Sequence, residues 1–164
     1  KSDSFILINS CLDVFLHEKS VSWPSGIRTN FGNLHRYFKG MTKKIIFSPD
    51  APAAIGPYSQ AVEVQGTLYV SGQIALAAFE SGVSIEEETD QVMKNMGHIL
   101  RAAGYSFQDV VKCTIFVKDM GHFAQINGVY GTYFTENFPA RETVEVARLP
   151  KDVRVEISCI AYKS

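Results

Sequence analysis

The chain has 164 residues, 46% hydrophobic and 20% charged, which is ordinary globular material with enough length for one core. A formal net charge of −1 and the absence of a Lys/Arg-rich block argue against a nucleic-acid surface that works by neutralising phosphates. No apolar run approaches the roughly 20 residues that span a bilayer, so no membrane partner is expected.

The three cysteines, Cys11, Cys113 and Cys159, have neither the even count nor the close spacing of a disulfide framework or a zinc site. We therefore expect a reducing, cytoplasmic location and no bound metal. Cys113 and Cys159 lie within alternating apolar runs, which favours packing in a core over a reactive thiol.

Residues 1–40 differ from the rest and are expected to be a leader or extension outside a domain of residues 41–164. Five Lys or Arg and three Asp or Glu give the first 39 residues a charge of +2, whereas eleven and fourteen give the remainder −3. A truncated organelle-targeting segment, for instance mitochondrial, translated upstream sequence and a poorly ordered extension all remain open. Asp3, Asp13 and Glu18 weaken the first, because transit peptides are poor in acids.

The predicted domain opens with a strand at residues 44–48, followed by the Pro-rich loop SPDAPAAIGPYS. A hairpin then joins strands at 61–64 and 67–71 through Gln65-Gly66, where glycine supplies the positive φ of a two-residue turn.

A helix is predicted from Ser84, which forms a capping box with Glu87, to Gly104, a typical C-terminal stop. Its apolar residues are three and four positions apart, which marks one buried face. They are Val92, Met93, Met96, Ile99, Leu100 and Ala103.

A strand at 110–118 follows, with Val111, Cys113, Ile115 and Val117 alternating on its covered face. A second helix, at about 122–134, repeats apolar residues at helical spacing, and strands at 142–147 and 153–161 close the domain. The residues that this second helix is expected to bury are Phe123, Ile126, Tyr130 and Phe134.

This order predicts an α+β domain in which both helices lie on one face of a mixed sheet. The other face would carry mixed polar and aromatic side chains, which suit a subunit interface better than open water. The residues expected to share or border it are Phe116, Thr143, Arg154, Glu156 and Ser158.

Candidate chemistry concentrates in FPARETVEVARLPKDVRVE, which sets Arg141 at the mouth of one strand and Glu156 inside the next. A guanidinium grips a carboxylate through two charge-assisted hydrogen bonds, and a nearby acid handles water or a proton. A solvated or salt-bridged Arg141, and a salt bridge from Glu156 to Arg141 or Arg154, are the structural alternatives.

Four further residues are candidates for the same site. Tyr58 is held in the Pro-rich loop, Ser71 and Gly72 end a strand, and Asn127 is a polar residue on the second helix. Packing explains the first three equally well, and a helix-to-strand hydrogen bond explains Asn127.

Several motifs, in order, resemble those of the Rid (YjgF-like) family over residues 41 to 163. They are APAAIGPYSQAV, YVSGQI, NMGHILRAAG, VVKCTIFVKDM, INGVYGTYF and FPARETVEVARLPKDVRVEI. The resemblance implies a chorismate-mutase-like fold, a homotrimer whose sheets form a central barrel, and clefts between subunits. It implies deamination of reactive imines and enamines by Arg141 (carboxylate), Tyr58 (cleft) and Glu156 (water), with Ser71, Gly72 and Asn127 lining the cleft.

Two departures from the family pattern stand out: Thr143 replaces a frequent Cys, and Ala75 replaces a Pro. Thr143 still offers its backbone to a substrate, so the activity is retained in this prediction. The implied substrates are 2-aminoacrylate and 2-iminobutanoate, with no cofactor. An endoribonuclease or translation inhibitor, and a non-catalytic trimer that binds keto acids or acts as a chaperone, are the alternatives.

Overall fold

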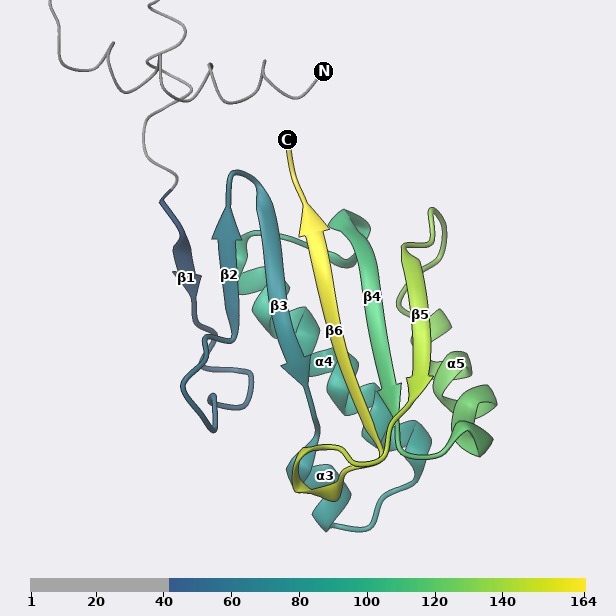
Figure 1. The fold of residues 1–164 in the computed structure, drawn as a ribbon. Helices are drawn as coiled ribbons and strands as arrows, with labels where there is room; N and C mark the ends of the chain where they lie inside the picture. Colours follow the sequence, from purple (N-terminus) through teal and green to yellow (C-terminus); the bar gives the residue numbers. More distant parts are fainter. Residues whose placement is uncertain (1–41) are drawn as a thin grey trace, which may run out of the picture. The chain divides into compact units, whose positions relative to one another are not determined.

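The computed structural model describes residues 42–164, whose framework is a six-stranded sheet with the order β1-β2-β3-β6-β4-β5 (Figure 1). The strands are β1 (Lys44–Ile46), β2 (Ala61–Val64), β3 (Thr67–Gln73), β4 (Val110–Val117), β5 (Ala140–Glu145) and β6 (Val155–Tyr162). Neighbouring strands are antiparallel except β4 and β5, whose parallel pairing requires a crossover connection.

The crossover from β4 to β5 contains α5 (Phe123–Gly131), which lies beside β5, while α4 (Ile85–Ala103) lies behind the sheet (Figure 1). A short helix, α3 (Leu76–Glu80), connects β3 to α4. Single 3-10 turns complete the described elements: η1 (Phe107–Asp109), η2 (Met120–His122) and η3 (Pro150–Asp152). The predicted α+β fold with helices on one face is confirmed.

Helix α4 begins and ends where its sequence predicts. The Ser84 hydroxyl accepts from the Glu87 backbone N at 3.1 Å, and the Glu87 carboxylate accepts from the Ser84 N at 2.9 Å. Gly104 follows the last turn at φ 82°, a left-handed conformation that glycine adopts without a Cβ penalty. The methionines of its buried stripe, Met93 and Met96, are core residues.

The core lies between the helices and the inner face of the sheet. Alternate residues of the central strands point into it and are buried, as the period of two requires. Among them are Leu68, Val70, Cys113, Ile115, Val155, Ile157, Cys159 and Ala161. Cys113 and Cys159 are free, buried thiols, as predicted; Cys11 and the predicted leader lie outside the described residues.

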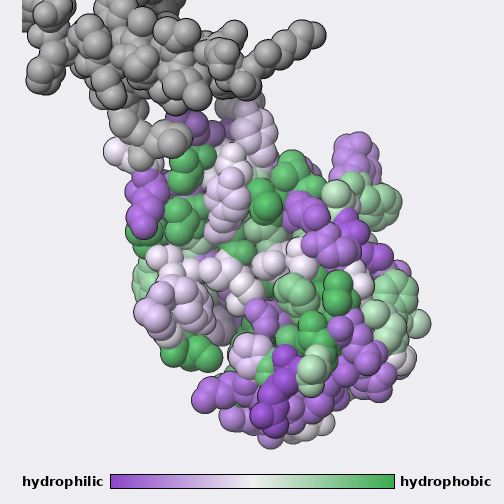
Figure 2. Space-filling view, in the orientation of Figure 1, coloured by the Kyte–Doolittle hydropathy of each residue, from purple (hydrophilic) through white to green (hydrophobic). Residues whose placement is uncertain are grey.

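The outer face of the sheet is not covered by either helix and carries apolar side chains. Ile45, Val62, Tyr69 and Ile160 are cross-strand neighbours in one row, and Phe116 lies between Glu156 and Val144 in another. Half of Ile45 and of Tyr69 is exposed, at 52% and 50%. Figure 2, seen from this side, shows hydrophobic side chains interspersed with polar ones across the face.

Two residues expected at the outer face lie elsewhere. Thr143 is aligned with the buried Ile115, so it belongs to the helix side of β5. Arg154 precedes β6, and its side chain turns to α4, where Nε donates to the Glu88 Oε2 at 2.6 Å. The prediction failed for Thr143 because periodicity gives the alternation of a strand but not its register against the neighbour.

Two apolar residues are more exposed than their spacing predicts. A register shift between Val110 and Lys112 buries Val110 and leaves Val111 49% exposed, because a bulge inserts one residue into the alternation. Phe123, the first residue of α5, is 38% exposed. None of the helices in the described part of the chain combines the length and apolar composition needed to span a bilayer.

Candidate active site

Arg141 stands on the helix side of β5, because it is aligned with the buried Cys113 of β4. Its Nη1 donates to the Oδ1 of Asn127 on α5 at 2.5 Å. Its Cζ lies 5.1 Å from the ring centroid of Tyr130 and 5.7 Å from that of Phe123. The helix-to-strand hydrogen bond foreseen as an alternative for Asn127 therefore exists, and its partner is the candidate arginine.

The charge of Arg141 is not neutralised within residues 42–164. No carboxylate of this segment lies within 4.0 Å of its guanidinium, and its one hydrogen bond there goes to a neutral amide. Nε and Nη2, which form one edge of the fork, have no hydrogen-bond partner in the same segment. That edge has the spacing to grip both oxygens of a carboxylate.

Beneath the guanidinium the surroundings are apolar and uncharged. Tyr130 is 4% exposed, and burial raises the pKa of its hydroxyl, as does the neighbouring Cys113 thiol, so the phenol stays neutral. Within the described residues, the buried hydroxyls of Tyr130 and Thr143 have no hydrogen-bond partner, Cys113 Sγ lying outside hydrogen-bonding geometry. No acid among residues 42–164 pairs with this cation.

Glu156 lies on the outer face of β6, beside Phe116, with its carboxyl against Gly72 of β3. A Cβ placed on Gly72 would lie 2.7 Å from the Glu156 Cδ, so only glycine leaves room for this side chain. Burial raises the pKa of Glu156, which favours its neutral, proton-donating form. Neither Arg141 nor Arg154 forms the salt bridge considered for it; Arg154 pairs with Glu88.

Ser71 precedes Gly72 and is hydrogen-bonded to the loop that carries Tyr58. The Ser71 hydroxyl donates to the Ser59 carbonyl at 2.7 Å, and its backbone N donates to the Gln60 carbonyl at 3.0 Å. The loop that carries Tyr58 is thereby fixed to β3. The Tyr58 ring is 47% exposed, and its hydroxyl accepts from the Ile55 backbone N at 3.3 Å.

Gln60 is a residue that the sequence prediction missed. It is 4% exposed, and its side chain accepts from the Ser48 N at 2.7 Å and donates to the carbonyls of Ser48 and Pro52 at 3.1 and 2.9 Å. It therefore closes the Pro-rich loop from inside. A polar residue at the start of an apolar strand was the available signal.

The candidate residues thus form two groups that one chain does not bring together. The first, the clamp, comprises Arg141, Asn127 and Thr143 on the helix side; the second, the acid group, comprises Glu156, Gly72, Ser71 and Tyr58. Arg141 and Glu156 are two strands and three residues apart in register. At the usual spacing of strands and residues, their Cα atoms are about 14 Å apart, with side chains on opposite faces.

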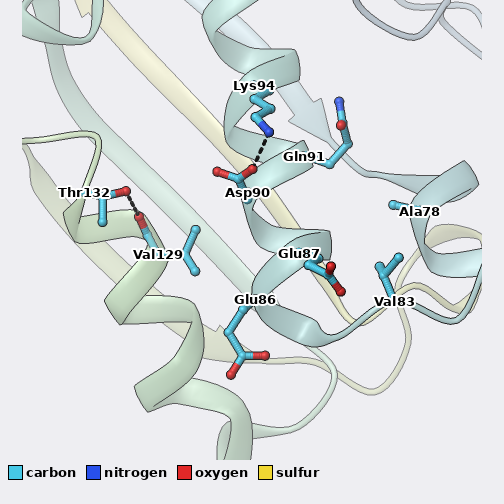
Figure 3. Close-up of a pocket in the computed structure, with 9 residues that line it drawn as sticks. All are labelled: Ala78, Val83, Glu86, Glu87, Asp90, Gln91, Lys94, Val129 and Thr132. Carbon is cyan, nitrogen blue, oxygen red and sulfur yellow. Dashed lines mark hydrogen bonds and ion pairs between the residues drawn. The ribbon is translucent and has the colours of Figure 1, made fainter.

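A groove of about 610 Å³ between α3, α4 and α5 contains none of these residues (Figure 3). Two of its acids already have partners: Glu87 caps α4, and Asp90 accepts from Lys94 and from the Tyr133 hydroxyl, both at 2.6 Å. The remaining lining is Ala78, Val83, Glu86, Gln91, Val129 and Thr132. The clamp and the acid group therefore lie outside this groove and remain the candidate site.

Comparison with known proteins gives the same family as the motifs. The model of the family described as Endoribonuclease L-PSP matches residues 48–163. A RutC family protein of Pyrococcus horikoshii is 49% identical over 124 residues, which is 74% of this chain and 98% of that protein. A 2-iminobutanoate/2-iminopropanoate deaminase of Mus musculus is 48% identical over 124 residues, which is 74% and 92% of the two chains.

Solved structures share the fold. The crystal structure of E. coli TdcF with bound serine has a TM-score of 0.70 and 40% sequence identity. The similarity covers 74% of this chain and 99% of that one.

Proposed function

The chain belongs to the Endoribonuclease L-PSP family, which is the Rid (YjgF-like) family of its motifs, and on that premise we propose that it hydrolyses reactive imines and enamines. The proposed substrates are 2-iminobutanoate and 2-aminoacrylate, and the products are 2-keto acids and ammonia. A single observation carries this proposal: Arg141 is oriented by neutral groups, and one edge of its fork has no partner in the described residues.

Arg141 would bind the substrate by its carboxylate. A bidentate guanidinium fixes both the position and the plane of a carboxylate, so the adjacent C=N carbon takes a defined direction. Tyr130 and Asn127, which contact the guanidinium, are neutral and leave its charge available to the ligand. The deaminase named among the relatives and the serine held by TdcF both point to small amino-acid-like ligands.

Glu156 would handle water and protons at the other end of the substrate. Water adds to the C=N carbon, a proton goes to nitrogen, and the resulting carbinolamine loses ammonia to leave the C=O of a keto acid. Burial raises the pKa of the Glu156 carboxyl, which favours its protonated form and so suits it to donate a proton and take it back within one reaction cycle. Imines already hydrolyse in water, so orientation and proton transfer account for the catalysis required.

We further propose that the working site forms between copies of the chain, as a homotrimer. Arg141 and Glu156 lie on opposite faces of one sheet, so a single small substrate cannot touch both in one chain. The outer face that carries Glu156 also carries exposed Ile45, Tyr69 and Val144, which suits burial against another copy.

The test couples a threonine dehydratase to the purified protein and follows release of the keto acid. The native chain should accelerate release, and Arg141→Lys should lose at least about 10-fold in kcat/KM, because a point charge cannot replace the planar fork. Circular dichroism of the variant controls for folding. Near-native turnover by Arg141→Lys would contradict the assignment.

Endoribonuclease activity is the second candidate, because the family model carries that description. The residues after Lys39 have eleven basic and fourteen acidic side chains, a charge of −3, which gives little attraction for a polyanion. RNA cleavage assayed on the same preparation distinguishes the two activities. Keto-acid binding without any acceleration would instead support the non-catalytic reading.

A further inference from the structure

We propose that Phe123 and Tyr130 are positioning residues that hold the guanidinium of Arg141 in the orientation that grips a carboxylate. The inference rests on the proposed function and deepens it. It assigns to α5 the orienting of the Arg141 guanidinium by two aromatic rings, in addition to the hydrogen bond that Arg141 donates to Asn127.

The three contacts come from one face of one helix. Phe123, Asn127 and Tyr130 are four and three residues apart, so their side chains project from α5 toward the same side. The ring centroids of Phe123 and Tyr130 lie 5.7 and 5.1 Å from the Arg141 Cζ, within the range of cation–π attraction. The Asn127 amide oxygen accepts a hydrogen bond from the Arg141 Nη1. The guanidinium is therefore constrained by three partners in residues 123–130.

The two rings differ in rigidity. Tyr130 is buried and packs on Phe134 at a centroid distance of 4.8 Å, and Phe134 packs in turn on Phe107 at 5.5 Å. This aromatic cluster fixes the Tyr130 ring as a floor. Phe123 begins the helix, is 38% exposed and acts as a side wall.

The exposure of Phe123 also has an explanation in this contact. Its helical spacing predicts burial, yet more than a third of it remains exposed in the single chain. A ring that faces a cation gains attraction without full burial, because the electron-rich face of the ring, and not only its area, contributes.

Arg154 shows what the same ring contact does when the arginine has a structural task. Its Cζ lies 5.8 Å from the Phe79 ring, and the buried Glu88 neutralises it through the 2.6 Å contact to Nε. Arg141 also contacts aromatic rings, but no acid in residues 42–164 neutralises it. Aromatic faces hold a cation and leave its charge uncompensated, so the Arg141 arrangement is suited to an incoming anion.

Four substitutions test whether the aromatic ring of Phe123 matters. Phe123→Leu should raise the KM for enzymatically generated 2-iminobutanoate about 3- to 10-fold with kcat changed less than about 2-fold. Phe123→Tyr and Tyr130→Phe keep both rings and should stay within about 2-fold of the native KM. Phe79→Leu is the matched control, because it removes a ring from the structural Arg154 and should leave KM unchanged.

Two measurements do not depend on turnover. The NMR resonance of the Arg141 Nε–H should move in Phe123→Leu, because one of its two ring-current contributions is lost, and should stay in place in Phe79→Leu. The Kd for 2-oxobutanoate, measured by calorimetry, should rise by the same factor as KM.

The outcomes distinguish the two proposals. An active native protein whose KM and Arg141 resonance are indifferent to Phe123→Leu overturns the positioning role and leaves the deaminase proposal intact. A native protein that binds 2-oxobutanoate in a Phe123-dependent way without turnover supports the positioning role and overturns the deaminase. A native protein that neither binds nor turns over overturns both.

Discussion

Gly72 shows how one residue can be required for the sake of its neighbour. Its backbone does not adopt a positive φ, so no conformational reason demands glycine. Its missing side chain instead leaves the space in which the Glu156 carboxyl lies. Because the atoms that would collide are the far end of a flexible side chain, a larger residue would displace the acid more readily than it would disrupt the sheet.

We therefore expect Gly72→Ala to lower kcat/KM at least about 10-fold while the free energy of unfolding changes by less than about 1 kcal/mol. Coupled turnover and urea unfolding measure the two quantities. Gly131→Ala is the control, since a Cβ there meets no atom within 4 Å. Unchanged turnover of Gly72→Ala would show that the position of the Glu156 carboxyl does not matter.

At the scale of residues, the sequence yields candidate side chains but not their surroundings. Arg141 and Glu156 are candidates because of their positions in consecutive predicted strands, and Asn127 because of its polarity beside an apolar stripe. Phe123 was predicted to be a core residue, because helical periodicity records that a residue is apolar and not that a cation faces it.

At the scale of elements, an ion pair between Glu88 and Arg154 connects the first turns of α4 to the start of β6. Glu88 is completely buried, and its two oxygens accept from the backbone N and the Nε of Arg154 at 3.0 and 2.6 Å. Arg154 Nη2 also donates to the Val83 carbonyl at 2.7 Å. This contact fixes where β6 enters the sheet, two residues before Glu156.

Arg154→Met should cost about 3–5 kcal/mol in urea unfolding, because it leaves the buried Glu88 carboxylate without its opposite charge. A second substitution, Glu88→Met, should recover much of that loss. Asp152→Asn, which breaks the exposed 2.8 Å pair with Lys118, should cost less than about 1 kcal/mol. Equal losses from the buried and the exposed pair would contradict this account.

The elements that could be predicted are those with a strong local signal. The capping box of α4, the Gln65-Gly66 turn and the alternation in β6 each follow from a few neighbouring residues. Helix α3 was missed, because five residues are too few for a periodic pattern. The bulge that exposes Val111 is a property of strand pairing, which one strand's sequence does not contain.

For the whole molecule, the decisive fact is the separation of the clamp from the acid group. Composition and motifs brought Arg141 and Glu156 into one hypothesis, but their placement on opposite faces depends on the register of β5, β4 and β6. Register is set by long-range pairing, so the sequence pattern could not predict it. The proposed assembly of copies reconciles the shared chemistry with this distance.

Mixing two impaired variants tests that assembly. Arg141→Lys and Glu156→Gln chains should each keep at most about a tenth of the native kcat/KM alone, and co-refolding them in equal amounts should raise activity above either. If each site takes its clamp from one copy and its acid group from another, random assortment makes about one quarter of the sites intact. Size-exclusion chromatography controls for assembly. No recovery in oligomers that are shown to be mixed would place both groups of each site in one chain.

The opposite orientation of the clamp and the acid group also bears on the life of a single polypeptide. On the proposed scheme, a newly folded single chain has every catalytic side chain and yet is inactive, because its Glu156 and Arg141 lie on opposite faces of its sheet. Association with other copies, rather than folding alone, would complete the active site.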